Sequence, residues 1–319
     1  MSDVAAVKSL VTKYNALRQE VAKVIIGQDD VVNQILISIF SGGHALLIGV
    51  PGLAKTLMVN TISQALGLDF KRIQFTPDLM PSDILGSEIL DESRQFKFIK
   101  GPIFANIILA DEINRTPPKT QAALLEAMQE RAVTVSGHHY KLDLPYFVLA
   151  TQNPIEQEGT YALPEAQLDR FLFKIDVGYP NLEEEILIIK THQDRKGVLP
   201  QTLIKSLLSE ADLLDYKSKI HEILVEEKIM IYIAQLITKT RNHPHLYLGG
   251  SPRASIAVLN ASKAYAAING RDFVIPEDIK KVLYPVLRHR IILTPEREME
   301  GMTTDKVIEM IVQSIEVPR

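Results

Sequence analysis

Lys55 and Thr56 are the first residues in this chain whose types and spacing could do chemistry together. They close the segment Gly49-Val50-Pro51-Gly52-Leu53-Ala54-Lys55-Thr56, which directly follows the apolar run Ala45–Ile48. A glycine-containing loop between a strand and a helix turns its backbone N–H groups toward phosphate, and the helix N-terminus adds positive potential. Lys55 would reach the β- and γ-phosphates of a nucleotide, and Thr56 would ligate magnesium. The segment predicts a phosphate-binding loop, and Leu57, which opens the helical stretch Leu57–Leu66, is grouped with it.

One position of this loop departs from the strict pattern. The pattern has glycine immediately before the lysine, and this chain has Ala54 there. A Gly-Pro turn followed by a surface lysine is the alternative interpretation. The apolar strand before the loop and the helical stretch after it favour the phosphate-binding interpretation, because that context is what the motif requires.

Acidic and amide side chains follow two later apolar runs. NIILADE (106–112) ends in Asp111-Glu112, and YFVLATQN (146–153) ends in Asn153. Open α/β sheets bind ligands beyond the carboxyl ends of their strands, so these residues would face the phosphate loop if the strands are neighbours. We expect Asp111 to hold magnesium through water, Glu112 to act as general base, and Asn153 to orient the attacking water or touch the γ-phosphate. Taken alone, an Asp-Glu strand end or an Asn-Pro turn is common without function.

The elements that must position these residues alternate in type. HALLIG (44–49) and FKRIQF (70–75) are also predicted to be strands, in addition to the apolar runs in 106–112 and 146–153. These four strands alternate with helical stretches, which is typical of an α/β domain with a mostly parallel sheet. After Pro180 helical patterns dominate, including Val225–Arg241, Ser255–Asn269 and Glu277–Arg288. We therefore expect an α/β domain at residues 1–180 and an α-helical domain at 181–319.

Two segments of the first domain read as projecting loops. Residues 76–104 contain several Pro and Gly residues around a short stretch in which apolar and polar residues alternate. This pattern predicts an insertion with a small hairpin and a helix. Residues 130–147 place alternating apolar residues on both sides of Ser136-Gly137, which predicts a second hairpin.

Composition limits the class of protein. The chain has 319 residues, 46% hydrophobic and 23% charged, as in a globular protein and unlike a disordered one. The absence of cysteine excludes thiolate chemistry, and a net charge of −4 gives no overall attraction to nucleic acid or an anionic membrane. No apolar run is long enough to span a membrane, and the N-terminus lacks the apolar core of a signal peptide, so we expect a cytoplasmic protein.

The order of these motifs along the chain resembles that of AAA+ ATPases, and the residue sequence of each motif resembles the MoxR family. The matching segments are GVPGLAKT, ADEINR, ATQNP, LPEAQLDRF (163–171) and GGSPRA (249–254), which together cover nearly the whole chain. Within that family Ala54 is no departure. The resemblance implies an AAA+ P-loop NTPase core, a parallel sheet flanked by helices, with a C-terminal α-helical lid, binding ATP and Mg²⁺ in a ring that is usually hexameric.

The resemblance also implies roles for residues that spacing alone does not single out. Arg170 would be the arginine finger that completes a neighbour's site, and Arg253 would be the sensor-2 arginine of the lid. Ile26 and Gly27 belong to a segment similar to the one that packs against adenine. Without the resemblance, an isolated arginine is more often solvated or salt-bridged.

MoxR-like proteins are similar to chaperones that remodel, assemble or activate other proteins. The resemblance therefore implies that this chain acts on a protein, its client. It also implies a partner with a von Willebrand factor A domain, which such proteins often have. The projecting loops would then face the pore or the client. A nucleic-acid motor, a small-molecule kinase and a nucleotide-gated scaffold with little hydrolysis are the alternatives.

His138-His139 and His243-Pro244-His245 have no carboxylates at ligand spacing, so we expect exposed turns and no metal beyond magnesium.

Overall fold

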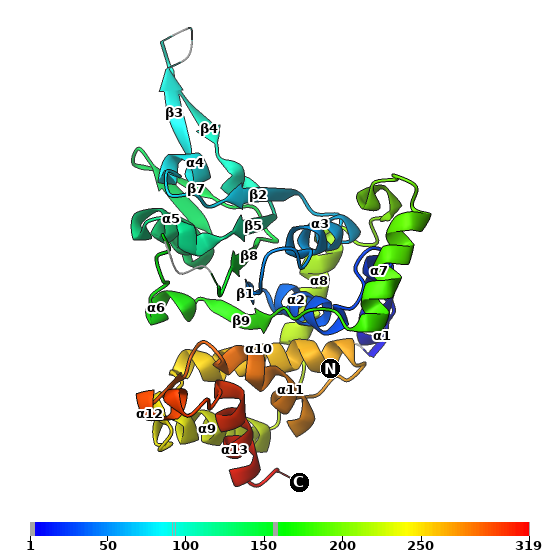
Figure 1. Ribbon diagram of the computed structural model, residues 1–319, viewed down its shortest axis with the longest axis vertical. Helices are drawn as coiled ribbons and strands as arrows, with labels where there is room; N and C mark the ends of the chain where they lie inside the picture. Colours follow the sequence, from blue (N-terminus) through cyan, green and yellow to red (C-terminus); the bar gives the residue numbers. More distant parts are fainter. Residues whose placement is uncertain (1–3, 91, 93, 156–158, 319) are drawn as a thin grey trace.

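The computed structural model describes residues 4–90, 92, 94–155 and 159–318. Its centre is a five-stranded sheet in the order β2-β5-β8-β1-β9, in which every neighbouring pair is parallel (Figure 1). The strands are β1 (His44–Ile48), β2 (Phe70–Gln74), β5 (Ile107–Asp111), β8 (Phe147–Gln152) and β9 (Phe171–Asp176). The α/β core with a parallel sheet is confirmed. The fifth strand, β9, was not expected; Lys174 interrupts its apolar run, and pairing with β1 makes it a strand.

The sheet is covered on both faces, which explains why its strands are apolar at consecutive positions. Ala45 and Leu47 of β1 belong to the core under the helices α1 to α3, whereas Leu46 between them packs with the core under α4 and α5. These helices are α1 (Val4–Ala22), α2 (Asp29–Ser41), α3 (Lys55–Ala65), α4 (Pro81–Leu85) and α5 (Pro118–Glu130). The sheet therefore lies as a rigid middle layer.

Two antiparallel hairpins stand on the α5 side of the sheet. One is β3 (Gly86–Leu90) with β4 (Phe96–Lys100), between α4 and the short 3₁₀ turn η1 (Pro102–Phe104), and projects from the molecule (Figure 1). The other is β6 (Ala132–Val135) with β7 (His138–Lys141), joined by Ser136-Gly137. The rings of Phe98 and Tyr140 stack with centroids 4.1 Å apart, so the two hairpins are in contact. His138 and His139 lie in β7, just after the turn.

The chain after Pro180 is mainly helical, as predicted. Its helices are α7 (Leu182–Asp194), α8 (Glu210–His221), α9 (Glu227–Arg241), α10 (Pro252–Ile268), α11 (Pro276–Leu287), α12 (Pro295–Met299) and α13 (Thr304–Ser314). Shorter elements are η2 (Ile113–Arg115), α6 (Glu165–Leu168), η3 (Pro200–Leu203) and the antiparallel pair β10 (Leu246–Leu248) and β11 (Ile292–Leu293). Asn181 caps the N-terminus of α7, since its side-chain oxygen accepts a hydrogen bond from the N–H of Glu184 at 3.0 Å.

These later helices form two groups in space. The segment with η3 and α8 packs against α1, α2 and α3, while α9 to α13 form a separate layer below β9, with α10 also against α2 (Figure 1). The division at residue 180 remains a prediction. Positions 91 and 93 of the expected insertion, and residues 1–3 and 319 of the expected domains, lie outside the described residues.

A buried arginine connects the layer formed by α9 to α13 to the sheet. Arg290 donates from Nε to Oδ1 of Asp169 at 2.6 Å and from its other nitrogens to four backbone carbonyl groups, including those of Phe171 and Leu172. Burial lowers the pKa of Arg290, and the Asp169 carboxylate opposes that shift. A buried cation with this many acceptors fixes the start of β9 to the end of α11.

His44 fastens the start of β1 to its neighbours. Its Nδ1 accepts the N–H of Val148 at 2.9 Å, so Nε2 carries the proton and donates to the carbonyl of Met128 at 3.2 Å. Burial lowers the pKa of His44 to about 4, and the positive charges of Arg131 and Lys217 act in the same direction. Burial also holds the pKa of His289 well below its usual value. Both rings are therefore neutral at pH 7.

We predict that acidification destabilises the fold through these neutral histidines. The unfolded chain takes up the proton first, so the stability that His44 contributes is present above about pH 6.5 and is lost as pH falls toward about 4. Between about pH 7 and pH 5 the loss from His44 is about 2 kcal/mol. The measurement is urea unfolding at both pH values. His44→Asn keeps an acceptor for Val148 and should show the smaller loss; an unchanged pH dependence would contradict this.

Candidate active site

The phosphate loop joins β1 to α3 and has the backbone that anion binding needs. Gly52 and Ala54 both have positive φ, 89° and 55°. The left-handed conformation explains why glycine is usual before the lysine; alanine tolerates it at a cost of about 1 kcal/mol. A Cβ on Gly49 would lie 2.9 Å from the carbonyl oxygen of Val177, so glycine permits close packing there. The N-terminus of α3 has no side-chain cap, which leaves its N–H groups to a ligand.

Nine of the predicted residues meet in one pocket of about 390 Å³ beyond the carboxyl ends of the strands. Five of them are polar, namely Lys55, Thr56, Asp111, Glu112 and Asn153, and the other four are Pro51, Gly52, Ala54 and Leu57. The order of the sheet produces this meeting, because β8 lies between β5 and β1. Asn153 therefore does lie beside the acidic pair, as the sequence predicted if these strands were neighbours.

The two carboxylates are held by different partners. Oδ1 of Asp111 accepts a hydrogen bond from the hydroxyl of Thr151 at 2.7 Å, and Oδ2 accepts one from the hydroxyl of Thr56 at 3.5 Å. Glu112 has a left-handed backbone with φ of 57°, and its N–H donates to the same Thr151 hydroxyl at 2.8 Å. Oε2 of Glu112 accepts a hydrogen bond from Nε2 of Gln74 at 2.8 Å, and it forms an ion pair with Arg115, whose Nη1 lies 3.3 Å away. Thr151 thus fixes the relative placement of the two acidic residues.

The donor set fits magnesium and a phosphate chain. Thr56 and Asp111 offer a hydroxyl and a carboxylate, the hard oxygen ligands that Mg²⁺ prefers, and they face the same space. Nζ of Lys55 donates to the carbonyl groups of Gly49 and of Val50, the latter at 3.3 Å, which holds the cation against the loop. Asn153 is buried, and its amide oxygen accepts the N–H of Ile155 at 3.2 Å, which fixes the amide.

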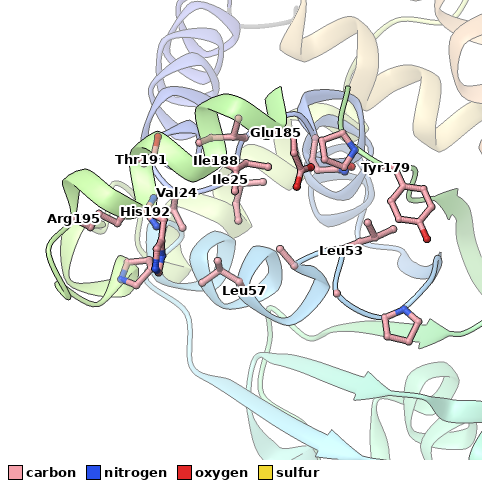
Figure 2. Close-up of a pocket in the computed structure, with 17 residues that line it drawn as sticks. Val24, Ile25, Leu53, Leu57, Tyr179, Glu185, Ile188, Thr191, His192 and Arg195 are labelled. Carbon is pink, nitrogen blue, oxygen red and sulfur yellow. The ribbon is translucent and has the colours of Figure 1, made fainter. Parts of the chain in front are cut away.

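A second compartment lies on the other side of the phosphate loop. This pocket of about 460 Å³ is lined by Pro51–Ala54 and Leu57 of the loop, by residues 24–26 and Gln28, and by one face of α7 (Figure 2). Ile25 and Ile26 supply an apolar wall of this pocket, and base binding there remains a prediction. Gly27 does not line the pocket itself; its φ of 72° allows the turn, and a Cβ there would meet Glu184 at 2.8 Å.

Helix α7 forms the roof of this compartment and is held mainly at its ends. Figure 2 shows Glu185, Ile188, Thr191, His192 and Arg195 along its pocket side. Nη2 of Arg195 donates to the carbonyl of Lys23 at 3.0 Å, and at the opposite end Nε2 of Gln28 donates to the carbonyl of Gly178 at 2.9 Å. No residue of α7 is buried, so little apolar packing secures it.

Sequence and structure comparisons agree with this geometry. Residues 44–173 match the profile described as "ATPase family associated with various cellular activities (AAA)", and residues 238–311 match an AAA lid domain. The chain is 45% identical to Chaperone MoxR1 of Mycobacterium tuberculosis, over 94% of this chain and 81% of that protein. It is 44% identical to Uncharacterized protein YeaC of Bacillus subtilis, over 94% and 93% of the two chains.

The chain belongs to the MoxR family of AAA ATPases. A crystal structure of a protein from Cytophaga hutchinsonii ATCC 33406 superimposes with a TM-score of 0.92 at 44% identity, covering 99% of this chain and 98% of that one. Membership of the AAA ATPases implies nucleotide binding, and the C-terminal helical lid is confirmed with the core. Among the described residues, no helix is both long and apolar enough to cross a membrane.

In this MoxR-family chain the two predicted arginines lie away from the phosphate loop. Neither is among the described residues that line the two compartments. Arg170 donates from Nη1 to the carbonyl of Leu125 at 2.7 Å, and its neighbour Asp169 lies 4.0 Å from Nη1 of Arg253. Arg253, at the start of α10, is 61% exposed. Arg253 thus approaches Asp169, the residue before Arg170, near the start of β9.

Four partners of the acidic pair were not predicted from the sequence. Thr151 lies inside the ATQN segment, Arg115 ends the ADEINR segment, and Arg72 and Gln74 lie in FKRIQF on β2. Alternation along a strand places residues 72 and 74 on one face, a signal that could have been used. Their partners could not be predicted, since only the pairing of β2 with β5 puts Gln74 opposite Asp111. Within the described residues, no cluster of three or more His, Asp or Glu suits a metal ion.

We predict that weakening the α7 roof speeds nucleotide release. Arg195→Ala removes a solvent-exposed, charge-assisted hydrogen bond to the carbonyl of Lys23, worth about 1 kcal/mol, or about fivefold in the dissociation rate. The measurement is stopped-flow release of a fluorescent ATP analogue. Lys190→Ala, which removes the same charge from an exposed position of α7, is the control and should leave the rate unchanged. Equal rates for both variants would show that Arg195 does not hold the roof.

Proposed function

We propose that this chain is a magnesium-dependent ATPase that works in a ring and couples ATP hydrolysis to remodelling of a protein client. The observation that carries the ATPase part is the convergence of Lys55, Thr56, Asp111, Glu112 and Asn153 in one pocket beside the phosphate loop. Positioning and charge stabilisation are the main tasks in phosphoryl transfer, and this set supplies both.

Each residue has a distinct task in this proposal. The loop N–H groups and Lys55 bind the phosphate chain, and Thr56 with Asp111, through water, would hold Mg²⁺, which neutralises charge on the β- and γ-phosphates when bound. Glu112 accepts the proton of the attacking water, and Asn153 orients that water. Gln74 and Arg115 both contact Oε2 of Glu112 and so orient its carboxylate.

A ring explains why two basic residues lie away from the chain's own site. Arg170 and Arg253 flank Asp169, where they could reach a nucleotide bound to a neighbouring copy. Nε of Arg170 is buried without a hydrogen-bond partner, so the observed contacts leave part of this guanidinium unsatisfied. An arginine supplied in trans stabilises the transition state of phosphoryl transfer. We propose that Arg170 is that residue, that Arg253 assists it, and that the ring is a hexamer.

The projecting β3–β4 hairpin supports a protein client. It exposes Ile89, Leu90, Phe96 and Ile99, and Phe96 is 77% exposed. Apolar side chains of this kind suit a protein surface better than a phosphate backbone. We propose that this hairpin and the β6–β7 hairpin contact the client, as the chaperone named among the relatives suggests. We also propose, from the family resemblance, that a von Willebrand factor A domain protein takes part.

Glu112→Gln tests the assigned base. The variant should bind ATP as the original chain does but lose turnover by at least about a hundredfold, because general base catalysis is worth that much. Steady-state phosphate release and fluorescent-nucleotide binding measure the two effects, with Glu126→Gln on the exposed face of α5 as control. If the two variants turn over ATP equally, Glu112 is not the base. If the original chain binds ATP without turnover, a nucleotide-gated scaffold is favoured.

A mixing experiment tests the ring. Arg170→Ala binds nucleotide but lacks the finger, and Lys55→Ala lacks nucleotide binding but keeps Arg170. Each alone should lose about a thousandfold or more of the turnover, the usual worth of these groups. Mixed, they should recover part of it, since an Arg170→Ala site next to a Lys55→Ala subunit is complete. Turnover per subunit of the original chain should also rise with protein concentration to a plateau. Failure of the mixture to recover would mean that Arg170 acts within its own chain.

A further inference from the structure

We infer that Arg72 is a positioning residue that competes with the divalent cation for Asp111 and thereby sets the Mg²⁺ concentration that the nucleotide site requires. The inference rests on the proposed function, since it assumes that Asp111 helps to hold Mg²⁺. Its basis is the hydrogen bonding of the Asp111 carboxylate, which the sheet arranges from three strands.

Arg72 occupies the carboxylate oxygen that faces the metal ligand Thr56. Its Nε and Nη2 donate to Oδ2 of Asp111 at 3.0 Å and 2.7 Å, and Thr56 Oγ1 approaches the same oxygen at 3.5 Å. The other oxygen, Oδ1, is taken by Thr151. A magnesium ion beside Thr56, with its water shell, would use Oδ2 as its acceptor. The guanidinium and the ion therefore act on the same atom with charge of the same sign.

The two partners of Asp111 differ in how easily they can leave. Thr151 belongs to β8 in the middle of the sheet and is buried, so its bond is fixed. Arg72 belongs to β2 at the edge of the sheet, and 47% of its side chain is exposed, against 12% for Asp111. The guanidinium can turn toward solvent without leaving a cavity. Its Nη2 also donates to Oε1 of Gln74, the residue that holds Glu112, so displacement of Arg72 would loosen Gln74 too.

The cost of displacing Arg72 is small but measurable. An ion pair with a half-exposed arginine is worth about 0.2–1 kcal/mol, so its removal should lower the half-saturating Mg²⁺ concentration by up to about fivefold. A purely structural role for Arg72 predicts the opposite sign, because an unsupported Asp111 would bind the ion less well.

The test is a Mg²⁺ titration of the binding of a fluorescent, non-hydrolysable ATP analogue to the full chain. For Arg72→Ala the half-saturating Mg²⁺ concentration should fall, by up to about fivefold. Arg72→Lys keeps the cation and should remain close to the original chain. Lys71→Ala removes a positive charge from the other face of the same strand and is the matched control, expected to leave the value unchanged. Thermal unfolding of all three variants establishes that they are folded.

The outcomes separate this inference from the proposed function. An unchanged or increased Mg²⁺ requirement in Arg72→Ala would overturn the competition. A fall of the same size in Lys71→Ala would also overturn it, because general electrostatics would then account for the effect. If the original chain binds the analogue equally well with and without Mg²⁺, both the magnesium site and the inference fail. A Mg²⁺-dependent original chain with no shift in Arg72→Ala contradicts the inference alone.

Discussion

The parallel pairing of β1, β5 and β8 is the constraint on which the site depends. Parallel strands end at the same edge of a sheet, and here the register sets Ile48 beside Gln152 and Leu109 beside Leu149. The phosphate loop, the acidic pair and Asn153 follow these three strand ends directly. A shift of one residue in this pairing would turn the side chains to the opposite face of the sheet. The buried apolar residues on both faces of the sheet prevent that shift.

Within this frame the acidic pair is held in a defined state by polar side chains from both neighbouring strands. Thr151 accepts one hydrogen bond and donates another, and so couples the backbone at Glu112 to the carboxylate of Asp111. From the other side, Arg72 and Gln74 connect the two carboxylates through each other. A network of this kind in a partly buried site strengthens each bond, and it also makes any exchange of partners a concerted event.

The lid is tied to the sheet at the start of β9, next to Arg170 and close to Arg253 of α10. Arg290 and His289 both bind the carbonyl of Phe171, and Arg290 also binds Asp169. Asp169 precedes Arg170, and its carboxylate lies 4.0 Å from Nη1 of Arg253. Helix α7, by contrast, covers the second compartment beside the phosphate loop and has no buried residue. The rigid anchor and the loosely held roof are therefore separate elements, and they contact different parts of the core.

The sequence by itself determined the phosphate loop, the acidic pair, four of the five strands and the helical second half. These depend on short-range patterns: consecutive apolar residues, glycine at left-handed positions, and polar residues at strand ends. Only the tertiary structure decided which of these segments meet, because strand order and register arise from packing between distant parts of the chain. It added β9, brought Arg72, Gln74 and Thr151 to the acidic pair, and placed Arg170 and Arg253 away from the phosphate loop of their own chain.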